Sequence, residues 1–208
     1  MFETLALVRW EADWPLLLAT FFLSYLLGSI PFGLIFGWLS GAGDIRKIGS
    51  GNIGATNVLR TGKRWAAAAT LIGDAGKALA AVLIARAYFG LPPFPVIAGF
   101  GAFLGHLYPV WLRFSGGKGM ASFIGIMLAL DFWIGILTCA SWLITARTVR
   151  ISSVAAMMAA AMTPVYFTLA GEYLYAALAV VLALLIFNSH RPNLARLRRG
   201  EEPRIGKS

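Results

Sequence analysis

The stretch PLLLATFFLSYLLGSIPFGLIFGWL, residues 15–39, contains no charged side chain and decides the fold class. A bilayer core is roughly 30 Å thick and takes about 20 helical residues per crossing, so this stretch is long enough to span a membrane. The rest of the chain has the same character, because 59% of its 208 residues are hydrophobic and 13% are charged, with a mean hydropathy of +0.75. Soluble domains do not have this composition. We therefore expect an all-α integral membrane protein with a single transmembrane domain, residues 1–208.

Other apolar stretches predict the remaining spans. They are residues 65–89, 94–111, 121–146 and 151–187. The third fits either one tilted helix or two short helices broken at Asp131, and the last is too long for one crossing and should break near Gly171 and Glu172. Gly33, Gly37 and Gly41 in the first span, and Gly101 and Gly105 in the third, have the four-residue spacing that lets membrane helices approach closely.

The distribution of basic residues favours a seven-transmembrane-helix bundle. With seven spans, the loop after the first span, two later turns and the C-terminal tail lie on one side, together with most of the 18 basic residues. With six spans the basic residues would divide almost evenly, against the positive-inside rule. We expect the N-terminus outside and the C-terminus in the cytoplasm. The net charge of +9 then reflects topology and attraction to anionic lipid rather than nucleic-acid binding.

Several kinds of chemistry are excluded by residue counts and missing motifs. Cys139 is the only cysteine, so an intrachain disulfide or a thiolate metal cluster cannot form, and two histidines are too few for a zinc site. No metal or cofactor is expected. A P-loop is absent, because Leu112 stands where the first glycine of a motif ending in Lys118 would be.

The first of three polar, glycine-bearing stretches is GSGNIGATNVLR, residues 49–60. Glycines let backbone N–H groups converge on an anion, small polar side chains add donors, and an arginine supplies a bidentate fork for phosphate. An ordinary loop with a topogenic arginine is the alternative. The candidate phosphate ligands are Gly49, Ser50, Gly51, Asn52, Gly54, Thr56, Asn57 and Arg60.

The second stretch is GHLYPVWLRFSGGKG, residues 105–119. It predicts an anion site, because Lys118 stands on a glycine turn at the start of a helix, where N–H groups are unpaired. His106 is a weaker candidate, since a histidine beside an apolar run is often bonded to neighbouring backbone. The candidates here are His106, Gly116, Gly117, Lys118 and Gly119.

The third stretch is NSHRPNLARLRRGEEPR, residues 188–204, directly after the last span. If it is helical, Asn193 and Arg196 share one face. The alternative is a basic amphipathic tail lying on anionic headgroups. The candidates are His190, Arg191, Asn193, Arg196 and Glu202. The seven-span topology places all three stretches on one membrane face, and this convergence is the main functional clue.

Two ionisable residues, Asp74 and Lys77, lie within the second span and three residues apart on one helical face. Charges at this depth are expensive, so they predict either a functional site or a structural pair facing the bundle interior.

With these residues assembled, the sequence closely resembles the bacterial acyl-phosphate:glycerol-3-phosphate acyltransferase family over nearly its whole length. The resemblance rests on the three stretches in order, each several residues long. The acidic and basic residues of the family's second span correspond to Asp74 and Lys77, and a hydroxyl that opens a later span corresponds to Ser152. Pro192 departs from the family pattern, and Glu201 occupies a usual threonine position, so the choice between Glu201 and Glu202 as the motif acid stays open.

The resemblance implies transfer of a fatty acyl group from acyl phosphate to the 1-hydroxyl of glycerol 3-phosphate, which gives lysophosphatidic acid and phosphate. It implies a multi-pass protein of the bacterial inner membrane with its active site at the cytoplasmic face. An organic-phosphate transporter or flippase is the alternative, but only one span carries ionisable residues at depth.

The residues suggest direct attack by the acceptor hydroxyl without a covalent acyl-enzyme, since a nucleophile elbow is absent. Ser50 and the residue 49–60 loop would hold one phosphate, while Lys118 and Arg60 would neutralise the departing one. His190 and Asn193 would position the acceptor, with Glu202 orienting the basic residues. The proton acceptor is either His190 or the departing phosphate.

Overall fold

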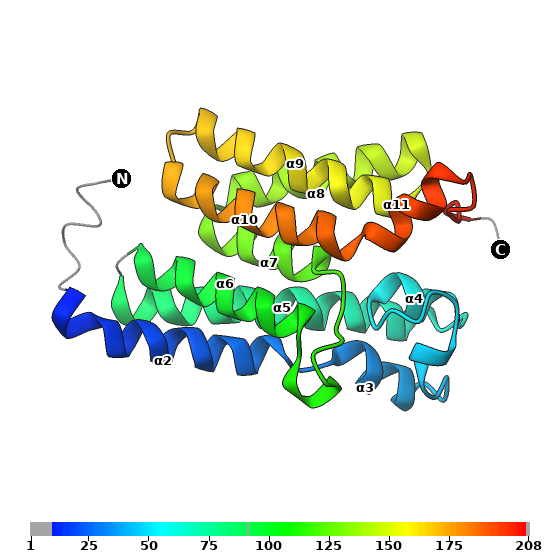
Figure 1. Ribbon diagram of the computed structural model, residues 1–208, viewed down its shortest axis with the longest axis horizontal. Coiled ribbons are helices and arrows are strands. Elements are labelled where there is room, and N and C mark those ends of the chain that lie inside the picture. The colour runs from blue at the N-terminus through cyan, green and yellow to red at the C-terminus, as the bar shows by residue number, and fades with distance from the viewer. Residues whose placement is uncertain (1–9, 91, 207–208) are drawn as a thin grey trace.

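The computed structural model describes residues 10–90 and 92–206, and all regular structure in these ranges is helical (Figure 1). The long helices lie roughly parallel or antiparallel to one another, and the elements labelled α3, α4 and α11 lie toward one end of the bundle. The longer helices are α2 (Trp10–Gly28), α3 (Phe32–Leu39), α5 (Arg64–Phe89), α6 (Pro93–Leu107), α7 (Met120–Leu130), α8 (Phe132–Val149), α9 (Ser152–Leu169), α10 (Tyr173–Ser189) and α11 (Arg191–Arg198). The short ones are η1 (Ile45–Lys47), α4 (Ala55–Leu59) and η2 (Val110–Leu112).

The first predicted span is broken into α2 and α3. Pro31 stands at the N-cap of α3 and cannot donate the backbone hydrogen bond that a continuous helix needs. The Leu27 carbonyl, which position 31 would bond in a continuous helix, accepts instead from the Ile30 N–H at 3.3 Å. By length and hydropathy the two helices together still form one candidate span, residues 13–39.

The stretch 121–146 forms two helices rather than one tilted helix. Asp131 ends α7 and caps α8, because its Oδ1 accepts a hydrogen bond from the Ile134 N–H at 2.8 Å. At the same end, Arg86 of α5 donates to the Ala129 and Leu130 carbonyls, each at 2.9 Å, which satisfies the last turn of α7. Residues 151–187 break as expected, at Gly171 (φ +80°).

Within the described residues, five helical segments are long and apolar enough to cross a membrane, or six if the bent pair α10 and α11 counts as one span. The α7 helix has 11 residues, a length of about 16 Å, and is shorter than a full crossing. The fold is therefore an all-α membrane bundle with five to six candidate spans.

Close helix approach relies on small residues. A Cβ added at Gly101 would lie 2.5 Å from the Phe21 carbonyl oxygen, and one at Gly105 would lie 2.1 Å from that of Tyr25. The spacing of these two glycines thus correctly predicts tight packing, and the partner of α6 is α2. Gly33 and Gly37 are also closely packed, but the prediction is wrong for Gly41, where an added Cβ would meet no heavy atom within 4 Å.

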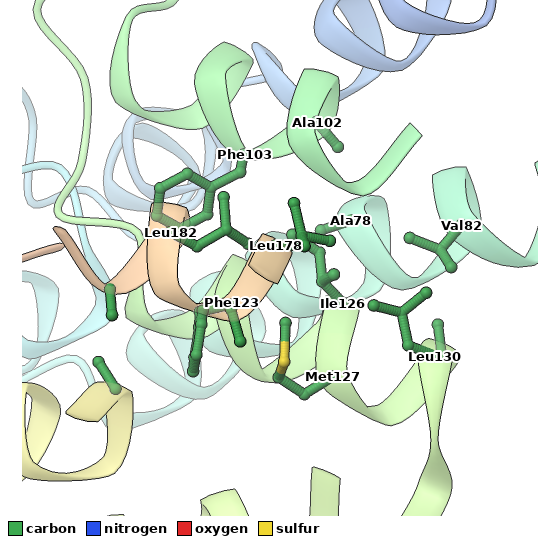
Figure 2. Packing of buried hydrophobic residues seen from close by; sticks show 14 of the residues in the cluster. Ala78, Val82, Ala102, Phe103, Phe123, Ile126, Met127, Leu130, Leu178 and Leu182 are labelled. Atoms are coloured by element: carbon green, nitrogen blue, oxygen red, sulfur yellow. The ribbon is translucent and has the colours of Figure 1, made fainter. Parts of the chain in front are cut away.

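The main hydrophobic core lies where α5, α6, α7 and α10 meet (Figure 2). Phe103, Phe123 and Ile126 are fully buried there, beside Met127 and Leu182. Large apolar side chains also cover the outside of the bundle, including Leu23 (68% exposed) and Ile72 (72% exposed). An apolar exterior of this extent is suited to lipid and not to water.

Candidate active site

The loop of residues 49–60 is organised by Asn57, whose side chain is buried. Its Nδ2 donates to the Ile45 and Ile48 carbonyls at 2.9 and 3.0 Å, and its Oδ1 accepts from the backbone N–H of Ser50 at 3.0 Å and from the Ser50 hydroxyl at 3.2 Å. Gly49 takes a left-handed conformation (φ +55°), as this turn requires. Asn57 therefore shapes the loop, while the exposed Ser50 stands at its surface.

The loop contains three further polar side chains, those of Asn52, Thr56 and Arg60. Asn52 Oδ1 accepts from the Gly54 N–H at 2.8 Å. Thr56 and Arg60 are exposed, and within the described residues neither side chain forms a hydrogen bond or ion pair. The Arg60 chain runs beside Gly49, where an added Cβ would lie 3.2 Å from Nη1. Arg60 is thus a cation with its donors available for a ligand.

The glycine turn that precedes α7 is folded back on the end of α6. The Gly116 and Gly117 N–H groups donate to the Leu107 and His106 carbonyls, each at 3.0 Å. These N–H groups therefore satisfy the end of α6. Gly119 has φ +88° and packs against the Phe103 ring. The N–H groups of Gly116 and Gly117 are therefore not available to an anion, and this turn contributes the Lys118 side chain to the site.

The third stretch reaches the same place from the end of α10. Ser189 Oγ donates to the Lys118 carbonyl at 3.1 Å, which ties α10 to the glycine turn. His190 is buried, and its Nδ1 lies 2.8 Å from the Ile186 carbonyl oxygen. Because a carbonyl oxygen only accepts, the ring proton is assigned to Nδ1. Arg191 is exposed at the start of α11.

A hydrogen-bonded network joins the second and third stretches. Lys118 Nζ donates to Asn193 Oδ1 at 2.5 Å, and Asn193 Nδ2 donates to Glu202 Oε1 at 2.5 Å. Glu202 Oε2 accepts from Arg196 Nε at 2.7 Å. The expected convergence of these two stretches is confirmed.

The two acids that the motif left open, Glu201 and Glu202, have different surroundings. Glu202 has a side chain only 6% exposed and lies in the network, whereas Glu201 is 55% exposed and pairs with Arg199 at 2.7 Å. A third donor to Glu202 is the Ser153 hydroxyl, at 2.8 Å from Oε1. Ser153 is the neighbour of Ser152, the hydroxyl residue expected here; Ser152 forms no side-chain hydrogen bond with a described residue. Adjacent side chains on a helix point about 100° apart, so only the tertiary structure shows whether Ser152 or Ser153 faces Glu202.

Positive charge dominates this site. Arg60, Lys118 and Arg196 lie close enough to interact electrostatically, and Glu202 is the acidic residue among them. Burial, together with Arg196 and Arg60, lowers the pKa of Lys118 to about 8, although Glu202 opposes the shift. Burial alone would raise the pKa of Glu202, but hydrogen bonds from Asn193, Ser153 and Arg196 lower it. With Lys118 protonated, three cations face one carboxylate, an arrangement suited to an anion such as phosphate.

The ionisable groups inside the bundle form a separate, buried group. Lys77 Nζ donates to Asp74 Oδ1 and to the Ile30 carbonyl, both at 2.7 Å, so it satisfies the backbone at the break between α2 and α3. His106 Nδ1 lies 3.5 Å from Asp74 Oδ1, and the His106 ring packs on Gly117. Asp74 and Lys77 are therefore paired with each other. No group of three or more metal-ligating side chains occurs in the part of the chain that the structure describes.

Comparison with known proteins gives a consistent result. Residues 18–200 match the family model described as glycerol-3-phosphate acyltransferase. A glycerol-3-phosphate acyltransferase of Cereibacter sphaeroides is 56% identical over 191 residues, covering 92% of this chain and 90% of the relative. One from Caulobacter vibrioides is 55% identical over 185 residues, with 88% and 85% covered.

Two crystal structures share the fold. Both are of PlsY (YgiH), described as an integral membrane glycerol 3-phosphate acyltransferase, and both are 34% identical to this chain and cover 91% of it. The glycerol 3-phosphate form has a TM-score of 0.87 with 96% of that chain covered, and the lysophosphatidic acid form has a TM-score of 0.84 with 95% covered. With a family model matched over most of its length and relatives more than half identical to it, this chain belongs to the glycerol-3-phosphate acyltransferase family.

Proposed function

We propose that this membrane glycerol-3-phosphate acyltransferase takes its acyl group from acyl phosphate and transfers it to the 1-hydroxyl of glycerol 3-phosphate. The products are lysophosphatidic acid and inorganic phosphate, and the reaction is the first step of phospholipid synthesis. The observation that carries the proposal is the cluster of Arg60, Lys118 and Arg196 around a single carboxylate, Glu202. Both proposed substrates bear phosphate, and this cluster suits a phosphorylated donor together with a phosphorylated acceptor.

The proposed roles follow the geometry of the site. Lys118 and Arg60 stabilise the charge that builds on the departing phosphate. His190 and Asn193 position glycerol 3-phosphate, and Glu202 holds Asn193 and Arg196 in place through its hydrogen bonds. The other residues proposed to bind substrate are Gly49, Ser50, Gly51, Asn52, Gly54, Thr56, Ser152, Arg191 and Arg196. Asn57, Gly116, Gly117 and Gly119 would act by shaping the loops of the site, and Asp74, Lys77 and His106 by supporting it from inside the bundle.

Acyl transfer proceeds by direct attack. The acceptor hydroxyl oxygen forms a bond to the acyl carbonyl carbon, the bond from that carbon to the phosphate oxygen breaks, and phosphate leaves. Acyl phosphate is a mixed anhydride with a good leaving group, so no acyl-enzyme is required. The hydroxyl proton has two possible acceptors: an oxygen of the departing phosphate, and Nε2 of His190, which is the unprotonated ring nitrogen when the proton is on Nδ1.

The same proposal includes the topology. We place α7 as a short fourth span, which brings the total to seven, with the N-terminus outside, the C-terminus in the cytoplasm and the site at the cytoplasmic face of a bacterial inner membrane. The basic residues of the site and tail support this orientation. Single cysteines at Ser50, Ser115 and Ser189 in a Cys139→Ser background should react with an impermeant thiol reagent from the cytoplasmic side only. Labelling of any of them from outside would contradict the topology.

Donor specificity provides the direct test of the proposed function. Purified protein in lipid should release phosphate from acyl phosphate when glycerol 3-phosphate is present and release little without it. Acyl-CoA should support no comparable rate, because the sequence offers no long nucleotide-binding surface. Equal rates of lysophosphatidic acid formation with acyl phosphate and acyl-CoA would overturn the proposed donor, and phosphate release independent of glycerol 3-phosphate would overturn direct transfer.

A further inference from the structure

The chain after α11 turns back and is fastened to the turn between α8 and α9. The backbone N–H of Ile205 donates to the Arg150 carbonyl at 2.7 Å, and Arg150 Nη2 donates to the Ile205 carbonyl at 3.3 Å. We call these two hydrogen bonds the latch and residues 199–206 the strap. Gly200 and Gly206 have φ values of +72° and +79°, which let the strap turn near both of its ends.

Glu202 lies between the two ends of the strap. Its neighbours Glu201, Pro203, Arg204 and Ile205 are exposed, while its own side chain is 6% exposed and accepts hydrogen bonds from Ser153, Asn193 and Arg196. The Glu201 N–H donates to the Arg196 carbonyl at the end of α11. Beyond α11, the strap has two attachments to the described part of the bundle: the latch and the Glu202 carboxylate.

These attachments connect with the catalytic site. Glu202 holds Asn193 Nδ2, and Asn193 Oδ1 accepts the hydrogen bond of Lys118 Nζ. A continuous series of contacts thus runs from Arg150 and Ile205 through the strap to Lys118. An irregular segment held at one point samples many conformations, and a second attachment removes much of that freedom.

We propose that Arg150 and Ile205 are positioning residues for acyl transfer, because their latch holds the strap where Glu202 can orient Asn193 against Lys118. The latch acts mainly through the backbone of Ile205, so the identity of its side chain matters little. The inference rests on the proposed role of Lys118 but not on the identity of the acyl donor, since each variant is compared with wild type using the same donor.

Ile205→Pro tests the latch, because proline has no N–H to donate to the Arg150 carbonyl. Ile205→Ala is the matched control: it removes the same exposed side chain and keeps the N–H. The expected result is a fall of about tenfold in kcat/KM for glycerol 3-phosphate in Ile205→Pro, as small misplacements of a site reduce rates. Ile205→Ala should stay within about twofold of wild type.

The pH dependence of kcat/KM distinguishes positioning from general destabilisation. The charged or titratable groups that face Lys118 are Arg60 after α4, Arg196 on α11, His190 after α10 and Glu202 on the strap. Only Glu202 raises the pKa of Lys118, so a displaced strap should lower that pKa below about 8. The alkaline fall in kcat/KM should accordingly move to lower pH in Ile205→Pro and stay in place in Ile205→Ala.

Two results would overturn the latch. One is an Ile205→Pro variant with the kcat/KM of Ile205→Ala, and the other is a lower kcat/KM with an unmoved alkaline fall. Arg150→Ala, which removes only the guanidinium hydrogen bond, should show a smaller change of the same kind, so the inference can be judged even if proline lowers the yield of folded protein. Full activity in Lys118→Ala would instead count against the proposed role of Lys118.

Discussion

Lys118→Ala should lower kcat and kcat/KM together, by about 100-fold to 1,000-fold, the loss measured for single electrostatic contacts to a transition state. Lys118 Nζ is held by Asn193 and lies near Arg60 and Arg196, so its charge adds to a site already positive. A contact that strengthens as charge moves onto the departing phosphate stabilises the transition state more than the bound substrate. Steady-state kinetics of purified protein in lipid measure both constants.

Two comparison variants make this result specific. Lys118→Arg keeps the charge but replaces a compact ammonium with a planar fork between Gly117 and Gly119, so it should restore only part of kcat. Lys63→Ala removes an exposed lysine at the start of α5 and should leave kcat unchanged. Wild-type kcat in folded Lys118→Ala protein would contradict the assignment and make Arg60 the next residue to test.

The spans could be predicted from the sequence because each is a long apolar run, and the breaks could be predicted only in part. Gly171 marks a visible break, and Asp131 offered two possibilities that its capping of α8 decides. The break between α2 and α3 was missed even though Pro31 is visible. Membrane helices tolerate proline when neighbours satisfy the freed backbone, and the neighbour here, Lys77, is 47 residues away.

The sequence predicted that the residues of the network lie together, but it did not predict the hydrogen bonds between them. Lys118, Asn193 and Glu202 were expected together because topology brings their stretches to one face. Gly116 and Gly117 were expected at an anion site, but their N–H groups donate to the Leu107 and His106 carbonyls at the end of α6. Such pairings depend on the packing of helices distant in sequence.

The two residues that sequence reasoning missed lie outside clear motifs. Ser153 differs from Ser152 only in the direction in which it points. Ile205 contributes its backbone to the latch, and no side-chain pattern reports a backbone hydrogen bond across 55 residues. Sequence patterns reveal polar side chains, but they do not reveal residues that act through their backbone N–H and carbonyl groups.

Gly33→Ala should lower kcat/KM by about 100-fold, although Gly33 lies in α3 and outside the three polar stretches. A Cβ at this position would lie 1.7 Å from the Ile53 carbonyl oxygen, deep inside contact distance. Ile53 is buried and belongs to the loop that carries Ser50 and Arg60. The loop must move by an ångström or more to admit the methyl group, and a displacement of that size can cost about 100-fold in rate.

Gly76→Ala is the matched control, because Gly76 is in α5 and an added Cβ would meet no heavy atom within 4 Å. It should keep wild-type kcat/KM and the same or higher thermal stability, since alanine favours a helix by about 1 kcal/mol over glycine. Overpacking at Gly33 should lower stability by about 1–3 kcal/mol, which thermal unfolding in detergent can detect.

The two measurements on Gly33→Ala separate two ways in which the structure can relieve the clash. If the loop moves, kcat/KM falls while the protein stays folded, because the 49–60 loop carries proposed ligands and α3 only supports it. If α3 moves instead, stability falls and kcat/KM stays near wild type, which would show that contact with Gly33 does not set the loop. The first outcome is expected, since α3 also packs at Gly37 against Ile45, where an added Cβ would lie 2.8 Å from a side-chain carbon, and this second contact limits how far the helix can shift.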